Sequence, residues 1–269
     1  MISIIICSRQ KNISKKLYEN IFETVGVPFE VICINNSDGW YNICSAYNKG
    51  VSKAQYPYLC FMHEDVTFCS KDWGKECIKA FEEPDIWMLG VVGTKYLDAT
   101  FPYWYPSPFL AGHGMKKNGE ISSFDNSHKS QEVVAVDGQW ICMKREAFEN
   151  DLRWDEKTFK KFDMYDIDMA MQVIHKGKKI QTLIGIDIYH ASGGNFTHTF
   201  YEESIKFHEK WDSILPVSSF PITKEVEETV NRYILKRLSS FEEREHNRRR
   251  KLSKWPFSIL YCIYKRIKI

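Results

Sequence analysis

The chain has 269 residues, of which 43% are hydrophobic and 27% are charged, with a formal net charge of +2. These values are typical of a folded globular protein and exclude disordered, collagen-like and coiled-coil classes. The length allows a full core and fits one large α/β domain as well as two small ones, and we start from one domain with appendages. No stretch reaches the roughly 20 apolar residues that a membrane-crossing helix needs.

The N-terminal residues predict the cellular compartment. MISIIICSRQ has no basic segment followed by a cleavage site and passes at once into a strand pattern, so we expect no signal peptide. The eight cysteines form no Cys-x-x-Cys pair, and several stand in apolar runs such as ISIIIC and YLCF, where cysteine acts as a small buried hydrophobe. Both features predict a cytoplasmic protein in a reducing compartment.

A β-α-β pattern opens the chain. Residues 2–7 and 29–35 are short runs rich in β-branched residues, and the polar stretch between them has the length of a helix. A helix-like run at 45–54 then precedes a buried strand at 56–62. This alternation predicts an α/β fold with a mostly parallel central sheet and helices on both faces, in which ligands bind beyond the carboxyl ends of the strands.

The middle of the chain is less regular. A helix pattern near 71–82 and a strand pattern at 89–93 precede a segment that extends to about residue 130 with weak periodicity, which predicts long loops that cover a site. Regular patterns return at 132–144, in a helix that begins near Asp166, and in a final strand at 180–190.

The first candidate site, His63-Glu64-Asp65, follows the strand at 56–62. Adjacent acidic side chains at a strand end suit Mg²⁺ or Mn²⁺, which prefer oxygen ligands. Such a pair standing alone is more often an exposed acidic turn.

Two further groups lie later in the chain. Asp166 and Asp168 open a predicted helix, where they either complement the helix dipole or supply a base for an incoming hydroxyl. His190, before Gly193 and Gly194, is either a metal ligand or an ordinary polar residue at a strand end, and paired glycines are more often just a turn.

The order of these motifs resembles that of family 2 glycosyltransferases, which have the GT-A fold, over about residues 2–211. ISIIICSR resembles the family's first strand, FEVICINNSDG its second strand and nucleoside loop, and NICSAYNKGVSKA its Asn-x-x-x-Ala-x-Asn-x-Gly helix. The resemblance implies the following donor-binding residues: Ser8, Arg9, Asn35, Asn36, Asp38, Asn48 and Glu64.

The same resemblance implies a metal site. YLCFMHEDV stands where the family has Asp-x-Asp, which makes Asp65 the metal-binding aspartate and places His63 where the first aspartate is usual. His190 matches a late histidine that completes the metal site in several such enzymes. The implied cofactor is a divalent cation, Mg²⁺ or Mn²⁺.

The resemblance also implies an acceptor face and a base. VDGQWICMKREAF and LRWDEKTF resemble the family's acceptor-side segments, which places Asp137, Gly138 and Trp140 at the acceptor. YDIDMAM aligns with Glu-Asp-x-Asp-Leu and makes Asp166 the catalytic base, with Asp168 as a second catalytic residue. The Tyr-Asp-x-Asp form is similar to that of a bacterial glycosyltransferase-like subgroup.

The resemblance therefore implies an inverting, metal-dependent glycosyltransferase of the hexosyltransferase type. It would move a sugar from a nucleotide-diphosphate sugar, with a UDP-sugar favoured, to a hydroxyl of a glycan, a lipid-linked molecule or a protein, in bacterial polysaccharide or glycoconjugate synthesis.

Three alternatives stay open. A sugar-nucleotide nucleotidyltransferase needs a glycine-rich loop after the first strand, whereas SRQKNISKK has no glycine. A non-catalytic carbohydrate- or nucleotide-binding protein of the same fold is favoured by His63 and by Tyr165, which stands where the family has glutamate. A metal hydrolase is disfavoured because the chain has no HExxH motif.

The C-terminal part is predicted to be an appendage: residues 1–221 form the GT-A domain and 222–269 a helical, basic, amphipathic tail. Residues 244–269 hold nine Lys or Arg and one Glu, a net charge of +8, which leaves −6 for the rest. An acidic body argues against a nucleic-acid partner. The tail either lies on an anionic membrane, at its inner face, or packs on the body or a second subunit.

Overall fold

The structure is a computed structural model that describes residues 1–99, 107–115, 119–124, 129–192, 198–234 and 236. Its centre is a seven-stranded sheet with the strand order β10-β13-β5-β12-β3-β1-β2. Strands β2, β1, β3, β5 and β13 run in one direction, and β12 and β10 run in the other. The bounds are β1 (Ile2–Ser8), β2 (Phe29–Asn35), β3 (Tyr58–Met62), β5 (Ile86–Gly90), β10 (Gln131–Val133), β12 (Trp140–Lys144) and β13 (Lys179–Thr182).

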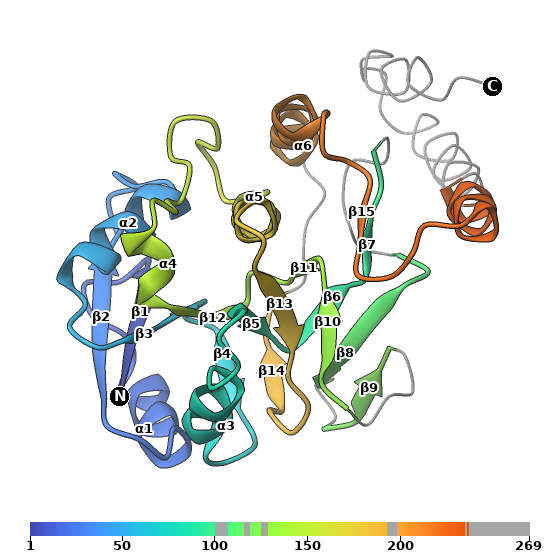
Figure 1. Cartoon of the computed structure of the whole chain (residues 1–269). Coiled ribbons are helices and arrows are strands. Elements are labelled where there is room, and N and C mark those ends of the chain that lie inside the picture. Colours follow the sequence, from blue (N-terminus) through green and yellow to red (C-terminus); the bar gives the residue numbers. More distant parts are fainter. Residues whose placement is uncertain (100–106, 116–118, 125–128, 193–197, 235, 237–269) are drawn as a thin grey trace, which may run out of the picture.

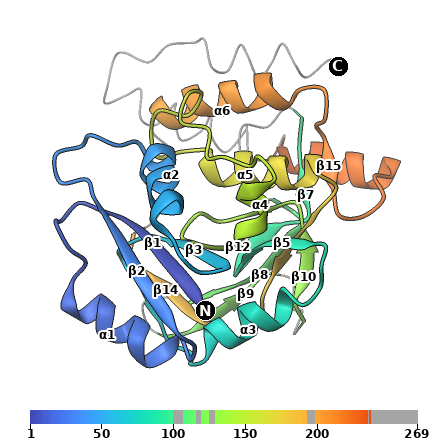
Figure 2. The ribbon, with the colours of Figure 1, turned by 60° about the vertical axis from the view of Figure 1, so that its left-hand side comes forward.

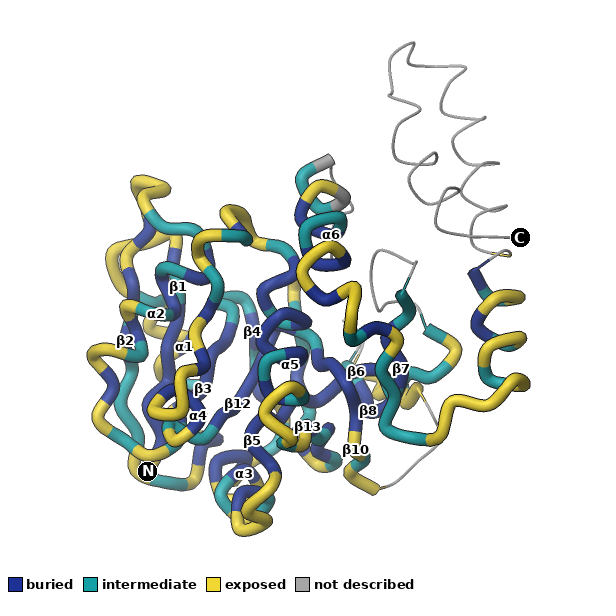
Figure 3. The backbone as a smooth tube through the Cα atoms, turned by 45° about the horizontal axis from the view of Figure 1, so that its top comes forward, coloured by how far each residue is buried: buried dark blue, intermediate teal, exposed yellow. Residues whose placement is uncertain are grey.

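Helices cover both faces of this sheet, as the sequence predicts (Figures 1 and 2). Helices α1 (Lys15–Thr24) and α3 (Trp73–Ala80) lie on one face; α2 (Ile43–Lys53), α4 (Arg145–Glu149) and α5 (Tyr165–His175) lie on the other. Because side chains alternate along a strand, Ile4 and Ile6 of β1 pack with α1 and α3, while Ile5 packs with α2. Figure 3 shows the central strands as almost continuously buried.

Local chemistry explains where the helices begin and how closely they pack. The side chains of Ser14 and Asn42 cap α1 and α2 by accepting the backbone N–H groups of Leu17 and Ser45. Gly50 lets α2 approach β1, since a Cβ atom there would lie 2.2 Å from Ile5 Cγ2.

A second sheet of six strands adjoins the first, with the order β11-β6-β8-β14-β4 and β9 paired to β8. Except for the parallel pair β8 and β14, its pairs are antiparallel. Its strands are β4 (Val66–Phe68), β6 (Val92–Thr94), β8 (Leu110–Met115), β9 (Ile121–Ser123), β11 (Ala135–Val136) and β14 (Ile188–His190).

This second sheet overturns two sequence predictions. The segment from 96 to about 130 holds β8 and β9 rather than loops alone, because strands this short show no clear alternation. The single strand predicted at 180–190 is two strands in different sheets, β13 and β14, separated by a turn with Gly185 at φ +90°.

The chain then returns to the body. Helix α6 (His198–Trp211) packs on the α5 side of the core, and β15 (Val217–Ser218) pairs with β7 (Tyr96–Leu97). A helix at 224–234 places Val230 and Ile234 against Tyr96. No helix in the part of the chain that the structure describes is long and apolar enough to cross a membrane. The basic segment 244–269 lies outside the described residues.

Candidate functional site

The carboxyl ends of three neighbouring parallel strands meet at one edge of the central sheet. Ser8 ends β1, Asn36 follows β2, and His63 follows β3. The Ser8 carbonyl accepts the Asn36 N–H at 2.7 Å, which keeps the first two ends together. They open into a pocket of about 330 Å³. It is lined by Cys7, Ser8, Arg9, Asn36, Ile43, His63, Glu64, Asp65, Phe162, Tyr165 and Ser192.

Glu64 ties the ends of β1 and β3 to each other. Its carboxylate accepts the Ser8 hydroxyl at 2.5 Å and the Arg9 backbone N–H at 3.2 Å. The Ser8 hydroxyl oxygen in turn accepts the Gln10 N–H at 3.0 Å. Because these bonds hold the turn after β1, Glu64 shapes the pocket wall that Arg9 lines.

Three ligand-type side chains gather beside this wall. His63 Nδ1 lies 3.2 Å from His190 Nε2, and His190 Nε2 lies 3.2 Å from Asp65 Oδ1. One donor atom from each residue lies within 4.8 Å of the other two. His190 reaches Asp65 because β14 pairs antiparallel with β4, which places His190 opposite Val66.

Asp65 is held as an ionised ligand. The Ser192 N–H donates to its Oδ2 at 3.0 Å, and the Ala191 N–H donates to its backbone carbonyl at 3.2 Å. Partial burial raises the pKa of Asp65, but the hydrogen bonds from Ser192 and the nearby His190 and His63 outweigh burial and bring the pKa below its ordinary value. The carboxylate is therefore available to a cation at neutral pH.

This cluster fits a divalent metal by its donor set. Two imidazole nitrogens and one carboxylate oxygen are ordinary ligands of divalent first-row metals. The structure brings together the two predicted ligands, Asp65 and His190, and adds His63, which sequence reasoning treated only as a replacement for an aspartate. The place of His63 directly after β3, two residues before Asp65, is the signal that points to it.

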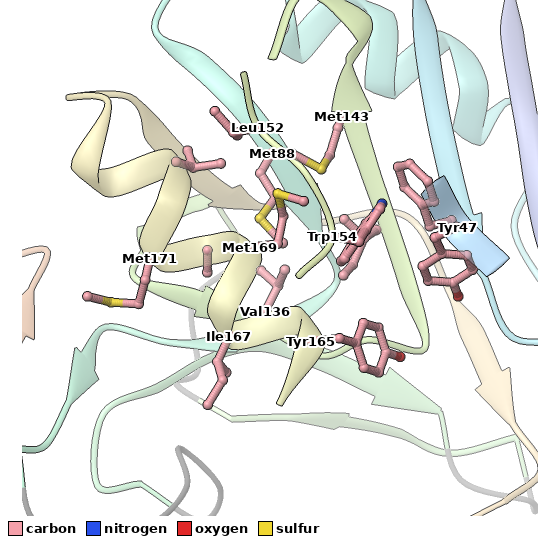
Figure 4. Close-up of a cluster of buried hydrophobic side chains, with 14 of the residues drawn as sticks. Tyr47, Met88, Val136, Met143, Leu152, Trp154, Tyr165, Ile167, Met169 and Met171 are labelled. Atoms are coloured by element: carbon pink, nitrogen blue, oxygen red, sulfur yellow. The ribbon is translucent and has the colours of Figure 1, made fainter. Parts of the chain in front are cut away.

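Tyr165 joins this cluster to the start of α5. Its hydroxyl oxygen lies 2.8 Å from His63 Nε2 and donates to the Gly138 carbonyl at 3.2 Å. Figure 4 shows Tyr165 in the same buried cluster as Tyr47 and Trp154. Gly138 makes room for it, since a Cβ atom at that position would lie 2.1 Å from the hydroxyl oxygen.

Asp166 follows in the first turn of α5 and is half-buried. It accepts the Gly138 N–H at 3.0 Å and the Ile167 N–H at 2.9 Å. Burial and the negative charge of Asp137 raise the pKa of Asp166 to about 7, against the opposing effect of the backbone hydrogen bonds. A carboxylate with a pKa near the working pH is suited to take up a proton.

The predicted acceptor residues fall in two different places. Asp137 and Gly138 lie beside Asp166, and the Asp137 carboxylate accepts the Gln139 N–H at 2.8 Å. Trp140 does not lie there: it is fully buried, with its ring 6.0 Å from that of Trp73 and perpendicular to it. The prediction for Trp140 is wrong because alternation along β12 turns it toward α3.

Asp168 also lies away from the pocket. It is 1% exposed, and its Oδ1 accepts Lys210 Nζ at 2.7 Å and Trp211 Nε1 at 2.8 Å. Its Oδ2 accepts Gln172 Nε2 at 2.8 Å. Its Oδ1 thus ties α5 to α6, and its Oδ2 is occupied within α5. This engagement of both oxygens disagrees with the predicted catalytic role of Asp168.

The predicted donor-binding residues divide similarly. Ser8, Arg9, Asn36 and Glu64 line the pocket, as the resemblance implies. Asn48 does not, because its side chain donates to the Trp154 carbonyl at 2.8 Å and ties α2 to that segment.

The loop after β2 lies at the margin of the pocket. Asn36 is held by both its amide atoms, which bond the backbone of Tyr41 at 2.8 and 2.9 Å. Asn35 at the end of β2 and Asp38 in the loop are exposed and do not line the pocket. Phe162 does, although it is 56% exposed, and no sequence pattern pointed to it. Gly193 and Gly194 lie outside the described residues.

Comparison with known proteins places this geometry in a wider group. A family model described as "Glycosyltransferase like family" matches residues 3–210. The fold resembles that of GalNAc-T7 with UDP, GalNAc and Mn²⁺, with a TM-score of 0.53 and 10% identity, over 78% of this chain and 48% of that chain. It also resembles the mannosyltransferase PcManGT from Pyrobaculum calidifontis in complex with GDP-Man and Mn²⁺, with a TM-score of 0.51 and 11% identity, over 75% and 60%.

These likenesses confirm the predicted GT-A fold. The matched part covers 48% and 60% of the two longer chains, and identities of 10% and 11% carry no statement about substrates. No protein of curated function matches the sequence.

Proposed function

The chain belongs to the glycosyltransferase-like family, and on this premise we propose that it transfers a sugar from a nucleotide-diphosphate sugar to an acceptor hydroxyl with inversion at the anomeric carbon. One observation carries the proposal. Hydrogen bonds run from His63 through Tyr165 and Gly138 to Asp166, so that a metal-type cluster and a carboxylate with a pKa near 7 belong to one connected site.

The donor is assigned to the pocket at the strand ends. Arg9, Asn36 and Ser8 line it beside the Asp65 cluster, and Glu64 holds the turn after β1. Such ends are where α/β sheets bind nucleotides. We propose a UDP-sugar as donor, with the exposed residues Asn35 and Asp38 closing on base or ribose.

A divalent cation, Mg²⁺ or Mn²⁺, is proposed to be held by Asp65 and His190. When bound, such an ion neutralises charge on phosphate oxygens and so favours departure of the nucleoside diphosphate. The depressed pKa of Asp65 supports this role, because the carboxylate stays ionised without the ion.

Asp166 is proposed as the base. Its carboxylate takes the proton of the acceptor hydroxyl, the hydroxyl oxygen forms a bond to the anomeric carbon, and the bond from that carbon to the diphosphate oxygen breaks. One displacement from the opposite face inverts the configuration. The neighbouring Asp137 and Gly138 are proposed to line the acceptor side.

The test is turnover of nucleotide sugars. The full chain is incubated with UDP-glucose, UDP-GlcNAc, UDP-galactose and GDP-mannose, each with Mn²⁺, with Mg²⁺ or with chelator, and release of the nucleoside diphosphate is measured with and without simple glycan acceptors. We expect release from at least one UDP-sugar that needs the metal and increases with acceptor. Tight binding without any release would instead support the non-catalytic alternative.

The cellular setting is proposed from composition alone. A glycan, lipid-linked or protein acceptor in bacterial polysaccharide synthesis would place the enzyme in the cytoplasm or at the inner membrane face, and the charge of +8 on residues 244–269 suits an anionic surface. The same segment could instead contact a second subunit. Co-sedimentation with phosphatidylglycerol vesicles, with and without residues 244–269, separates the two: unchanged sedimentation would reject the membrane role.

A further inference from the structure

The pocket holds one more ligand-type side chain than the two that the proposed function needs. His63 lies on β3's carboxyl end, opposite His190, with its Nδ1 3.2 Å from His190 Nε2. Its other nitrogen, Nε2, lies 2.8 Å from the hydroxyl oxygen of Tyr165. Nδ1 can bind a cation only if it carries the lone pair of the neutral ring, so the tautomer of His63 decides whether His63 can be a ligand.

The spacing of the three donor atoms suits a single small ion. His190 Nε2 lies 3.2 Å from His63 Nδ1 and 3.2 Å from Asp65 Oδ1. Two ligand atoms about 2.0–2.2 Å from one ion lie about 3 Å apart when they subtend a near-right angle. The side chains therefore need little movement to share an ion.

The hydroxyl of Tyr165 decides the protonation of His63. A phenol has one hydrogen, and Tyr165 donates it to the Gly138 carbonyl, which can only accept. The hydroxyl oxygen is then left to accept at 2.8 Å from His63 Nε2. In a neutral imidazole with the proton on Nε2, Nδ1 carries the lone pair, and Nδ1 is the atom that faces His190 and Asp65.

Gly138 and the buried aromatic cluster hold this hydroxyl in place. A side chain at Gly138 would meet the Tyr165 hydroxyl oxygen at 2.1 Å. The Tyr165 ring packs against both Tyr47 and Trp154, at centroid distances of 5.9 and 5.8 Å. In a metal-binding histidine, the ring nitrogen that does not face the metal commonly bonds an outer group, and this bond fixes the tautomer of the imidazole.

We propose that His63 is the third protein ligand of the metal, that Tyr165 is the positioning residue that turns its lone pair toward the ion, and that the site prefers Mn²⁺ and other first-row divalent metals over Mg²⁺. This rests on the proposed function for the identity of the pocket. The preference follows from the ligand set: two imidazoles and one carboxylate match transition metals, whereas Mg²⁺ is best matched by oxygen ligands alone.

The experiment measures Mn²⁺ binding to the full chain without nucleotide, from the loss of the EPR signal of free Mn²⁺, with Mg²⁺ as competitor. We expect Mg²⁺ to displace Mn²⁺ only at a concentration at least about tenfold higher. Tyr165→Phe should weaken Mn²⁺ binding about 10- to 100-fold. His63→Asp, which supplies an oxygen ligand, should shift the preference toward Mg²⁺.

Tyr47→Phe is the matched control, because Tyr47 is an equally buried tyrosine whose hydroxyl has no hydrogen-bond partner among the described residues. It should leave Mn²⁺ affinity within about twofold of wild type. Thermal unfolding of each variant separates loss of the ligand from loss of the fold, and ¹⁵N spectra of the imidazoles report whether His63 keeps its proton on Nε2.

Wild-type Mn²⁺ affinity in Tyr165→Phe, an unchanged preference for Mn²⁺ over Mg²⁺ in His63→Asp, or equal competition by Mg²⁺ in wild type would overturn the inference. Because no nucleotide is present, this outcome is independent of turnover. Sugar transfer with unchanged Mn²⁺ affinity in Tyr165→Phe and an unchanged metal preference in His63→Asp overturns the inference alone. The expected affinities and preference without turnover of any donor overturn the proposed function alone.

Discussion

Two groups of carboxylates lie on opposite sides of the first turns of α5, and different partners balance their negative charges. The pocket cluster consists of His63, Asp65, His190 and Asp166; the lysine cluster consists of Asp155, Asp168 and Lys210. In the lysine cluster, Lys210 Nζ lies 2.8 Å from Asp155 and 2.7 Å from Asp168. No Lys or Arg contacts the carboxylates of the pocket cluster among the described residues.

This difference separates a structural carboxylate, Asp168, from the proposed base, Asp166, only two positions away. Asp168 is saturated by protein donors and holds α6, whereas Asp166 has a pKa raised to about 7 by burial and by Asp137. Their spacing in the sequence says nothing about the difference. It depends on which direction each side chain takes from the helix and on whether a lysine meets it.

Removing the negative charge of Asp65 from the pocket cluster should have the largest effect on transfer. Asp65→Asn deletes the ionised ligand, and because metal-assisted stabilisation of a leaving group amounts to several kcal/mol, transfer should fall at least about 100-fold at fixed Mn²⁺. Stability should change little, since Asp65 is partly exposed. Steady-state turnover at saturating donor measures the effect, and turnover within threefold of wild type would contradict a metal role for Asp65.

Removing the lysine cluster's charge should affect stability instead. Lys210→Met leaves Asp168 buried without a cation, and breaking a buried pair costs about 3–5 kcal/mol. We expect a lower urea midpoint with Mn²⁺ affinity unchanged. Lys178→Met is the control, because Lys178 is 28% exposed, much like Lys210, but its partner Asp85 is 52% exposed and stays solvated without the lysine. If the two variants lose equal stability, the cluster does not hold α6 as described.

The two clusters should also differ in how pH acts on stability. The raised pKa of Asp166 makes its contribution to stability complete below its ordinary value near 4 and lost as pH rises through about 7. Metal-free protein should therefore have a lower Tm at pH 8 than at pH 6, and this decrease should be smaller in Asp166→Asn. Equal decreases in both proteins would mean that Asp166 titrates well below pH 6.

The smallest effect concerns the outer carboxylate of the lysine cluster. Burial raises the pKa of Asp155, but the hydrogen bonds from Lys210 and Thr158 lower it to about 2. Its stabilising effect is thus present above pH 4 and is lost as pH falls toward 2. Because the pair is partly exposed, Asp155→Asn should cost about 1 kcal/mol at pH 7 and markedly less at pH 2, as acid and urea titrations would show.

Much of the fold could be predicted because its elements carry local patterns. Strands β1 and β3 are short, almost continuously buried apolar runs, and α2 follows a side-chain cap at Asn42. The second sheet could not, because its strands of two to six residues pair across long separations. The pairing of His190 with Val66, which builds the pocket cluster, is of this kind.

Site residues could be predicted where a sequence motif fixes their position. They could not be predicted where the direction of the side chain decides what it contacts. Asp65, His190 and Asp166 follow from motif order and meet in one connected site. Trp140 and Asn48 stand in the expected motifs, yet one faces the α3 side of β12 and the other binds Trp154. No pattern along the chain shows these partners, because they come from distant segments.

The central claim is that Asp166 is the base of a sugar transfer, and the most direct test compares Asp166→Asn with Asp163→Asn. Asp163 is a matched control because its pKa is also raised, to about 6, by burial and by Glu203, yet it does not bond Gly138. With a donor that wild type turns over, we predict that kcat falls about 10²- to 10⁴-fold in Asp166→Asn while donor affinity is unchanged, and that Asp163→Asn stays near wild type. Equal kcat in Asp166→Asn and wild type would contradict the account.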